Sequence, residues 1–228
     1  MSRSYGQYCG LARALDVVGD RWNLLIVRQL LIAPARYREL LDGLGGVATN
    51  LLADRLRDLE TAGVVERRLA DEGNAIVYAL TPWGAGLREP VESLVRWSTP
   101  LMARGPGGDR VQSEWLVVGL GALFAGRAAS RPSTVGVAVG GQVLQLRATR
   151  SGIEVTLHDG GALDAVVRAD APTVLGLAAG AFALDDAGGL VDIEGDEAAA
   201  RALFDSGRSD AEGSTRRASS GDRPSDRR

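Results

Sequence analysis

Apolar positions in the first hundred residues recur mostly with the period of an α-helix. The repeats fall into five segments, and Pro34 and Gly63 stand where two of them end. The pattern predicts helices near 9–18, 21–32, 36–44, 49–62 and 82–103. Before the last helix, the runs VVERRL (64–69) and AIVYAL (75–80) flank the polar loop ADEGN. They predict a pair of strands.

This order of elements is that of a winged helix-turn-helix domain, in which one helix enters the major groove of DNA beside a two-stranded wing. Segment 49–62 has the two faces that such a helix needs. Its apolar stripe consists of Leu52, Leu56 and Leu59. Its opposite face is polar.

The amino-terminal turns of a recognition helix approach the base edges. We therefore predict base contacts from Thr49, Asn50, Ala53, Asp54 and Arg57. Asn pairs bidentately with adenine, and a small residue meets a thymine methyl group. An exposed helix face with ion pairs at i,i+3 spacing, Asp54 with Arg57 and Arg55 with Asp58, explains the same pattern equally well.

Four arginines are candidates for phosphate contact: Arg36, Arg38, Arg67 and Arg68. Arg36 and Arg38 stand at the start of the helix before the recognition helix, where backbone N–H groups also favour anions. Neighbouring strand residues point to opposite faces, so only one of Arg67 and Arg68 faces a phosphate easily. The other is expected in solvent or beside an acid. Ordinary surface arginine is the alternative for each.

The segments CGLARALDVVGDRWNLLIVRQL, ARYRELLDGLGGVATNLLADRLRDLETAGVVER and YALTPWGAGL resemble the HxlR family of bacterial winged-helix regulators over residues 8–100. The resemblance implies a homodimer that binds a palindromic operator and dimerises through its first and last helices. The last helix has a matching apolar stripe: Leu87, Val91, Leu94 and Leu101. Pro90 and Pro100 interrupt it and predict a kink or a shorter helix.

Two positions near helix starts affect this interpretation. The family usually has serine where Ala48 stands, and since alanine is a poor cap, Thr49 is a candidate for the N-cap instead. Cys9 stands where thiol-sensing members carry their cysteine, and a helix start lowers a thiol pKa. A small buried cysteine without a redox role is the alternative.

Beyond the glycine and proline break ARGPGGDR (103–110), the pattern changes. We predict a helix at 111–129, a hairpin that turns at Gly140 and Gly141, a strand at 162–169 and a helix at 171–180. A strand, a turn and a helix from near Asp196 follow.

This order resembles the sterol-carrier-protein type two-like domain over 110–206, through DAPTVLGLAAGAFALDDA and VDIEGDEAAARALF. The resemblance implies helices on one face of a five-stranded sheet, with an apolar cavity between them for a hydrophobic molecule. The candidates for its lining are Trp115, Leu116, Leu123, Phe124, Leu175, Leu177 and Phe182. Ordinary core packing is the alternative for each of them.

The predicted fold class is therefore α+β. A winged helix-turn-helix domain (1–104) precedes a linker (105–110), a sterol-carrier-protein-like domain (111–205) and a disordered tail (206–228). The tail has no apolar periodicity and is rich in serine, arginine, aspartate and glycine.

Charge argues mildly against a DNA-binding protein. The net charge is −3, and all 26 basic residues are arginine. Residues 1–104 carry 13 arginines against 12 acids, or +1, whereas residues 105–205 carry 7 against 13, or −6. No segment has the strongly basic balance of non-specific DNA binders, so locally placed arginines must make any DNA contact.

The remaining features exclude several classes of protein. No apolar run is long enough for a membrane span, no secretory signal is visible, and the single cysteine fits a reducing cytoplasm. His158, the one histidine, lacks metal co-ligands and a nucleophile motif, so it is expected on the surface. We predict no enzyme activity, no metal and no cofactor.

The sequence thus predicts a dimeric regulator that binds double-stranded DNA and responds to a hydrophobic effector in its second domain. One alternative is a thiol-sensing regulator that acts through Cys9. The other is a lipid-binding carrier protein, which the near-neutral charge of the first domain favours.

Overall fold

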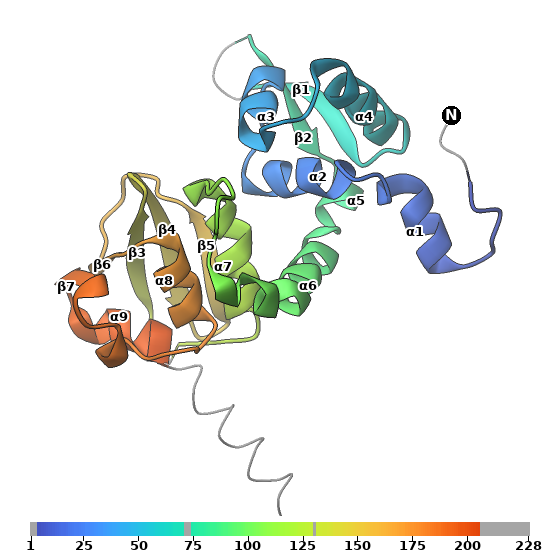
Figure 1. Cartoon of the computed structure of the whole chain (residues 1–228). Coiled ribbons are helices and arrows are strands. Elements are labelled where there is room, and N and C mark those ends of the chain that lie inside the picture. Colours follow the sequence, from blue (N-terminus) through green and yellow to red (C-terminus); the bar gives the residue numbers. More distant parts are fainter. Residues whose placement is uncertain (1–3, 71–73, 130, 206–228) are drawn as a thin grey trace, which may run out of the picture. The chain divides into compact units, whose positions relative to one another are not determined.

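The structure is a computed structural model that describes residues 4–70, 74–129 and 131–205 (Figure 1). The chain divides into unit 1, with Met1–Pro100 and Glu114–Ala122, and unit 2, with Leu101–Ser113 and Leu123–Arg228. The predicted tail, 206–228, and part of the predicted loop ADEGN lie outside the described residues.

Unit 1 has the predicted order of helices followed by a wing. Its first four helices are α1 (Gly10–Val18), α2 (Asn23–Ile32), α3 (Tyr37–Leu44) and α4 (Thr49–Thr61). The wing consists of β1 (Val65–Leu69) and β2 (Ile76–Leu80), which pair antiparallel. An isolated bridge also pairs Ala35 with Tyr78 of β2. Gly63 ends α4 in the left-handed conformation (φ 76°), as predicted.

The apolar stripes of these helices meet in one core. Its largest side chains are Ile26, Leu40, Leu52, Leu56 and Leu59, each at most 1% exposed. Burial of one such side chain stabilises the fold by roughly 1.5–3 kcal/mol. The core also includes Val118, which lies beyond the predicted linker. Unit 1 is therefore completed by a segment that follows residue 113.

The helix predicted at 82–103 is shorter, as its prolines predict, but part of the interruption lies elsewhere. The segment forms α5 (Pro82–Ala85), α6 (Arg88–Ser98) and the 3₁₀ helix η1 (Thr99–Arg104). Pro90 does not break α6, because it is the third residue of that helix and first-turn N–H groups have no intrahelical acceptor. The interruption falls instead at Gly86 and Leu87, and the tighter η1 contains Pro100.

Unit 2 is built on a five-stranded sheet in the order β5-β4-β3-β6-β7. The strands are β3 (Ser133–Val139), β4 (Gln142–Thr149), β5 (Gly152–Leu157), β6 (Ala165–Arg168) and β7 (Asp192–Gly195). β3 pairs parallel with β6, and the other pairs are antiparallel. The predicted hairpin is confirmed, with Gly140 and Gly141 at φ 57° and 84°.

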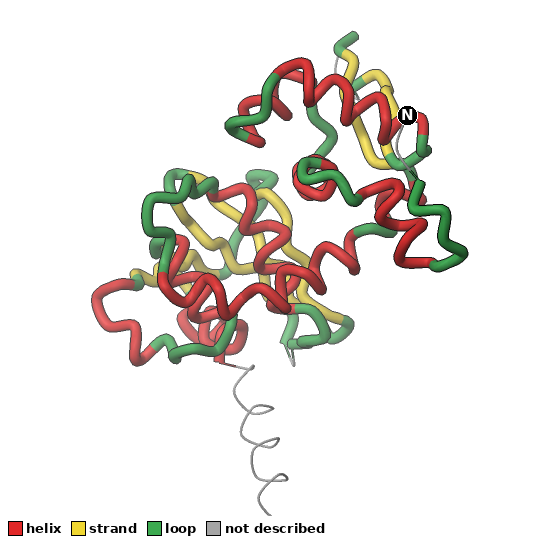
Figure 2. Tube along the Cα trace, turned by 45° about the vertical axis from the view of Figure 1, so that its right-hand side comes forward, coloured by secondary structure: helices red, strands yellow, loops and turns green. Residues whose placement is uncertain are grey.

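The helices of unit 2 are α8 (Ala171–Ala178), α9 (Glu197–Asp205) and the 3₁₀ helix η3 (Asp185–Leu190). α8 crosses in front of the sheet in Figure 1, and α9 packs on β3, β6 and β7. Figure 2 distinguishes the strands, in yellow, from these helices, in red. Alternate residues of β3 and β4, such as Val137 and Leu144, are fully buried. The chain therefore combines an N-terminal helical unit with a C-terminal β-sheet region, an α+β fold.

The helix predicted at 111–129 is shorter and belongs to both units. The 3₁₀ helix η2 (Ser113–Trp115) leads into α7 (Leu116–Phe124). Leu116 to Ala122 count with unit 1, and Leu123 and Phe124 count with unit 2. Gly126, at φ 79°, follows the end of α7, where a left-handed residue cannot continue a helix.

Candidate nucleic-acid interface

Helix α4 has the two faces that the sequence predicts. Leu52, Leu56 and Leu59 are at most 1% exposed and seat the helix in the core of unit 1. The predicted base-contact residues lie on the other side. Thr49, Asn50, Asp54 and Arg57 are exposed, whereas Ala53 is half-buried. Four of these five side chains are therefore free to meet a ligand that approaches α4 from solvent.

The start of α4 differs from one prediction. Ala48 is the N-cap, with extended backbone (φ −69°, ψ 141°) and no side-chain cap, so Thr49 is not the cap. The hydrogen bond from Leu52 N to Ala48 O closes the first turn and makes Thr49 the first helical residue. Tyr37 of α3 donates to Thr49 O at 2.6 Å, which ties the two helices together.

The predicted ion pairs at i,i+3 spacing are present. Asp54 and Arg57 lie 3.0 Å apart, with side chains 55% and 71% exposed. A pair as exposed as this one stabilises a helix by about 0–1 kcal/mol, so it opens at little cost. Both interpretations of this face thus describe the same side chains, which pair with each other when nothing is bound.

The two arginines of the wing have different surroundings. Arg67 donates to Glu60 at 2.6 Å, so one of the pair lies beside an acid, as predicted. Arg68 is exposed and has no ion pair with any acid among the described residues. Among the described residues, Arg68 is therefore the wing arginine that no acid neutralises.

Two further arginines stand at the start of α3. Arg36 is its N-cap residue and Arg38 lies in its first turn, and both side chains are exposed. The backbone N–H of Arg36 donates to Glu39 at 2.6 Å, so this carboxylate occupies part of the helix start. Neither arginine has an ion pair within the part of the chain that the structure describes.

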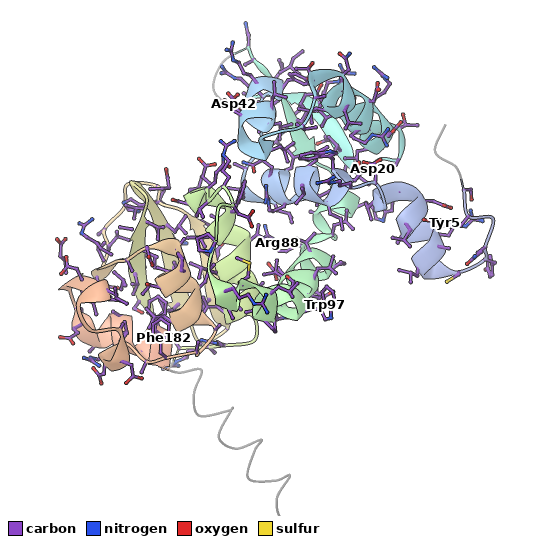
Figure 3. All side chains as sticks on the ribbon, in the orientation of Figure 1. Tyr5, Asp20, Asp42, Arg88, Trp97 and Phe182 are labelled. Atoms are coloured by element: carbon purple, nitrogen blue, oxygen red, sulfur yellow. The ribbon has the colours of Figure 1, made fainter. Side chains whose placement is uncertain are left out.

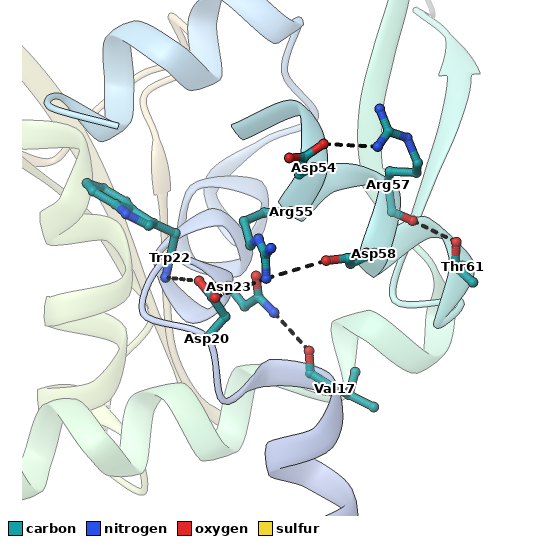
Figure 4. Close-up of polar contacts among 9 residues, drawn as sticks. All are labelled: Val17, Asp20, Trp22, Asn23, Asp54, Arg55, Arg57, Asp58 and Thr61. Carbon is teal, nitrogen blue, oxygen red and sulfur yellow. Dashed lines mark hydrogen bonds and ion pairs between the residues drawn. The ribbon is translucent and has the colours of Figure 1, made fainter. Parts of the chain in front are cut away.

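A polar cluster that the sequence did not predict ties α4 to the start of the fold (Figure 4). Arg55 Nη1 lies 2.9 Å from Asp20 and 3.4 Å from Asp58. Asp20 also accepts from the backbone N–H of Trp22 at 3.2 Å, and Asn23 donates to Val17 O at 2.8 Å. The helical spacing predicts only the contact with Asp58, because Asp20 is 35 residues from Arg55.

Cys9 is exposed and forms the N-cap of α1, so the alternative of a buried cysteine is wrong. The nearby backbone N–H groups of Ala12 and Leu11 lower the pKa of the Cys9 thiol, because they favour the thiolate, although the thiol makes no side-chain cap hydrogen bond. The thiol is thus accessible to solvent and activated relative to an ordinary cysteine.

Apolar side chains are exposed on the first and last helices of unit 1. On α1, Leu11 and Leu15 are 69% and 41% exposed. On α6, Leu94 is about half exposed and Trp97, which Figure 3 labels, is 75% exposed. Leu101 of η1 is also 75% exposed, but it belongs to unit 2. Val91 of the predicted stripe is instead buried in the core. The exposed residues are available to a partner with an apolar surface.

The predicted pocket residues do not form one group. Trp115 and Leu116 count with unit 1, where the guanidinium of Arg28 lies 4.1 Å above the Trp115 ring. Burial lowers the pKa of Arg28 to about 10. Trp115 therefore has a packing role in unit 1.

The other five candidates, Leu123, Phe124, Leu175, Leu177 and Phe182, lie in unit 2. Phe124 and Leu177 are at most 1% exposed, and the Phe124 ring packs on Phe204 at 5.7 Å. The Phe182 ring lies against Gly176, where a Cβ atom would collide with it. A hollow of about 300 Å³ beside the β4–β5 turn has none of these candidates in its lining, which consists of Arg147, Thr149, Ser151, Gly152, Ile153 and Glu154.

His158, expected on the surface, is half-buried, and its Nδ1 lies 3.1 Å from the side-chain amide of Gln145. Among residues 4–70, 74–129 and 131–205, no three His, Cys, Asp or Glu side chains gather as a metal site requires. Within the same ranges, no helix combines the length and the apolar character that a bilayer crossing demands.

Comparison with known proteins places the similarity in unit 1. Residues 17–105 match the HxlR-like helix-turn-helix family. The chain is 31% identical over 86 residues to the HTH-type transcriptional regulator YodB of Bacillus subtilis, a match that covers 37% of this chain and 77% of YodB. It is 35% identical over 88 residues to YvaP, an uncharacterized HTH-type transcriptional regulator of the same organism, covering 38% and 82% of the two chains.

Parts of two solved structures are also similar to this chain. PA1607, described as a putative transcription factor, is 34% identical with a TM-score of 0.41, over 47% of this chain and 74% of that chain. Quinone-bound YodB from B. subtilis is 29% identical with a TM-score of 0.35, over 40% and 96%. The chain matches the two regulators from B. subtilis over more than three quarters of their length. It therefore belongs to the HxlR family of helix-turn-helix transcriptional regulators.

Proposed function

We propose that the protein is a homodimeric regulator whose α4 reads bases in the major groove of a palindromic operator. The observation that carries this proposal is the exposed polar face of α4, opposite a stripe that is buried in the core. Asn50, at the amino-terminal end of that face, pairs with adenine, and Arg57 leaves Asp54 to contact a base or phosphate. Ala53, which is half-buried, and Thr49 complete the contact.

Phosphate contacts position α4 without reading sequence. We assign this role to Arg36, Arg38 and Arg68, which have no ion pairs among the described residues, and a smaller share to Arg67, which Glu60 neutralises in part. The near-neutral balance of residues 1–104 then makes binding dependent on these few charges, and hence on salt.

The exposed apolar residues of α1 and α6 support a homodimer. Leu11, Leu94 and Trp97 of unit 1 are side chains that a second copy would cover. A two-fold dimer places its recognition helices on half-sites about 34–36 Å apart or at multiples of that spacing. We therefore expect Leu94→Arg to weaken binding to the palindrome much more than binding to a single half-site.

The effector is assigned to unit 2. The five-stranded sheet and its helices support a sterol-carrier-protein-like domain, with residues 111–205 as its proposed extent and 1–104 as that of the DNA-binding domain. Leu123, Leu175 and Phe182 are half-buried, so a hydrophobic molecule would reach them before the fully buried Phe124 and Leu177. A ligand that favours one state of the dimer then changes operator affinity by linkage. The protein is on this proposal a regulator and has no catalytic activity.

Binding to DNA from its own promoter region, with unrelated DNA as competitor, tests the base-reading role. Wild type should bind selectively, and Asn50→Ala with Arg57→Ala should lose the selectivity. Arg21→Ala is a matched control, because Arg21 is an exposed arginine of unit 1 outside α4 and the wing. Equal, weak binding of wild type to both DNAs would instead favour the lipid-carrier alternative.

A second candidate function is thiol sensing, and the exposed, activated Cys9 favours it. The relative YodB has a quinone-bound structure, and quinones are electrophiles that react with thiolates. With one cysteine per chain, the response would be an adduct or a disulfide between two copies. An electrophile should then release wild type from its operator and leave Cys9→Ser bound.

A further inference from the structure

Helix α4 has a third face, which belongs neither to the core nor to the base-reading side. Arg55 occupies it, with a side chain that is 24% exposed. Its Nη1 lies 2.9 Å from Asp20 and 3.4 Å from Asp58. The contact with Asp58 stays within α4. The contact with Asp20 is an ion pair from α4 to the loop between α1 and α2.

The carboxylate of Asp20 is itself held in place. One oxygen binds Arg55, and the other accepts from the backbone N–H of Trp22 at the start of α2. The next residue, Asn23, is 3% exposed and donates to Val17 O at the end of α1. Figure 4 shows that these contacts converge beside α4. Asp20 is therefore an anchor held at the start of α2, and the neighbouring Asn23 ties that point to α1.

The apolar stripe of α4 gives a less specific restraint. Contacts of Leu52, Leu56 and Leu59 are non-directional, so they define the rotation of the helix about its axis less sharply than an ion pair does. A helix with side chains is about 10–12 Å across, so a rotation of about 20° moves its surface by about 2 Å. That shift breaks a hydrogen bond to a base edge, which needs about 2.7–3.2 Å.

We infer that Arg55 is a positioning residue for base reading: its ion pair with Asp20 fixes the rotation of α4, so that Asn50 and Arg57 meet the base edges in one register. This role rests on the proposed function of α4. Arg55 lies outside the exposed face of the helix, and its positioning role requires no contact between Arg55 and DNA.

Two substitutions of equal charge separate this role from simple electrostatics. Asp20→Asn removes the charge of the anchor and keeps an oxygen that can accept from Trp22 N–H. Asp58→Asn removes one negative charge from α4 itself and leaves the Asp20–Arg55 pair intact. Both variants raise the net charge by one, so both strengthen contact with phosphates. Only Asp20→Asn weakens the tie between α4 and the rest of the fold.

The measurement uses the full-length protein and two duplexes, one selected by wild type from a random-sequence pool and one with the same composition in scrambled order. We expect the ratio of the two dissociation constants to fall about tenfold in Asp20→Asn, as expected for the loss of one base contact. The ratio should stay within about twofold of wild type in Asp58→Asn. Arg55→Gln should match Asp20→Asn, and the double variant should lose no more than either single variant.

A purely structural role would lower the melting temperature and leave the ratio for the folded protein unchanged. Equal ratios in Asp20→Asn, Arg55→Gln and Asp58→Asn, measured well below their melting temperatures, would overturn the positioning role while the DNA-reading function stands. A wild type that selects no sequence from the pool would overturn both. A lower ratio in Asp20→Asn and Arg55→Gln alone supports the role.

Discussion

Arg67 and Arg68 are neighbours on β1, yet Glu60 neutralises only Arg67. We expect Arg68→Ala to weaken binding to every DNA sequence and to lower the slope of log K against log salt by about 1. Arg67→Ala should change that slope less, because Arg67 already has a counter-ion. Gel-shift titrations at four salt concentrations measure both slopes. Equal changes in the two variants would contradict the assignment of the wing contact to Arg68.

The lowered pKa of Cys9 predicts how the reactivity of this thiol depends on pH. Its folded pKa is lowered by the N–H groups at the start of α1, and the thiolate is the reactive form. The rate of alkylation by iodoacetamide should therefore rise with pH and reach half its maximum below 9.0, the ordinary value for this thiol. The same chain unfolded in urea is the control. A midpoint in the folded protein at or above that of the unfolded chain would show that the helix start does not activate Cys9.

At the scale of elements, α4 begins without a side-chain cap. Ala48 already has the extended backbone that a capping residue adopts. Ala48→Ser should therefore accept a hydrogen bond from a first-turn N–H and stabilise α4 by about 1 kcal/mol. Amide exchange in the helix should slow by about fivefold, which mass spectrometry measures.

Ala53→Ser is the matched control for this change, because it places the same side chain inside α4, where serine is a slightly weaker helix former. It should leave exchange unchanged or faster. Slower exchange in both variants would mean that serine acts through something other than the cap.

Local pattern predicted the elements whose contacts are close in sequence. The faces of α4, the Asp54–Arg57 pair and the Gly140–Gly141 turn follow from spacings of a few residues. A kink or a shorter helix in 82–103 was predicted, but the position of the break at Gly86 and Leu87 was not. The proline at 90 marks a helix boundary in general, but it stands in the first turn of α6, where it is tolerated.

Contacts between segments that are distant in sequence could not be predicted either. The Asp20–Arg55 pair joins residues 35 apart, and nothing in either segment names the partner. Trp115 looked like a pocket residue because it is large and apolar, whereas its ring packs under Arg28. Residue type indicates that a side chain will be buried, but only the fold decides against which neighbour.

At the scale of the whole chain, unit 1 includes part of α7. Val118 is 1% exposed in its core, and Arg96 donates to Ala122 O at 3.3 Å. A chain that ends at Arg104 should therefore be less stable than one that ends at Phe124, by roughly the 1.5–3 kcal/mol of one buried valine. Thermal unfolding followed by circular dichroism compares the two.

Val118→Ala in the longer chain is the control for this comparison, since it removes the side chain and keeps the helix. Its melting temperature should fall part of the way toward that of the chain that ends at Arg104. Identical melting of all three proteins would show that residues beyond Arg104 add nothing to the stability of unit 1.

The position of Trp115 in unit 1 also determines what the intrinsic tryptophan fluorescence of the protein reports. All four tryptophans and all four tyrosines of the chain lie in unit 1, and the three phenylalanines lie in unit 2. Light that excites indole therefore produces emission from unit 1 alone, while unit 2 remains silent. A hydrophobic molecule that binds unit 2 and still alters this intrinsic fluorescence would reveal, in one titration without any label, that the DNA-binding unit responds to it.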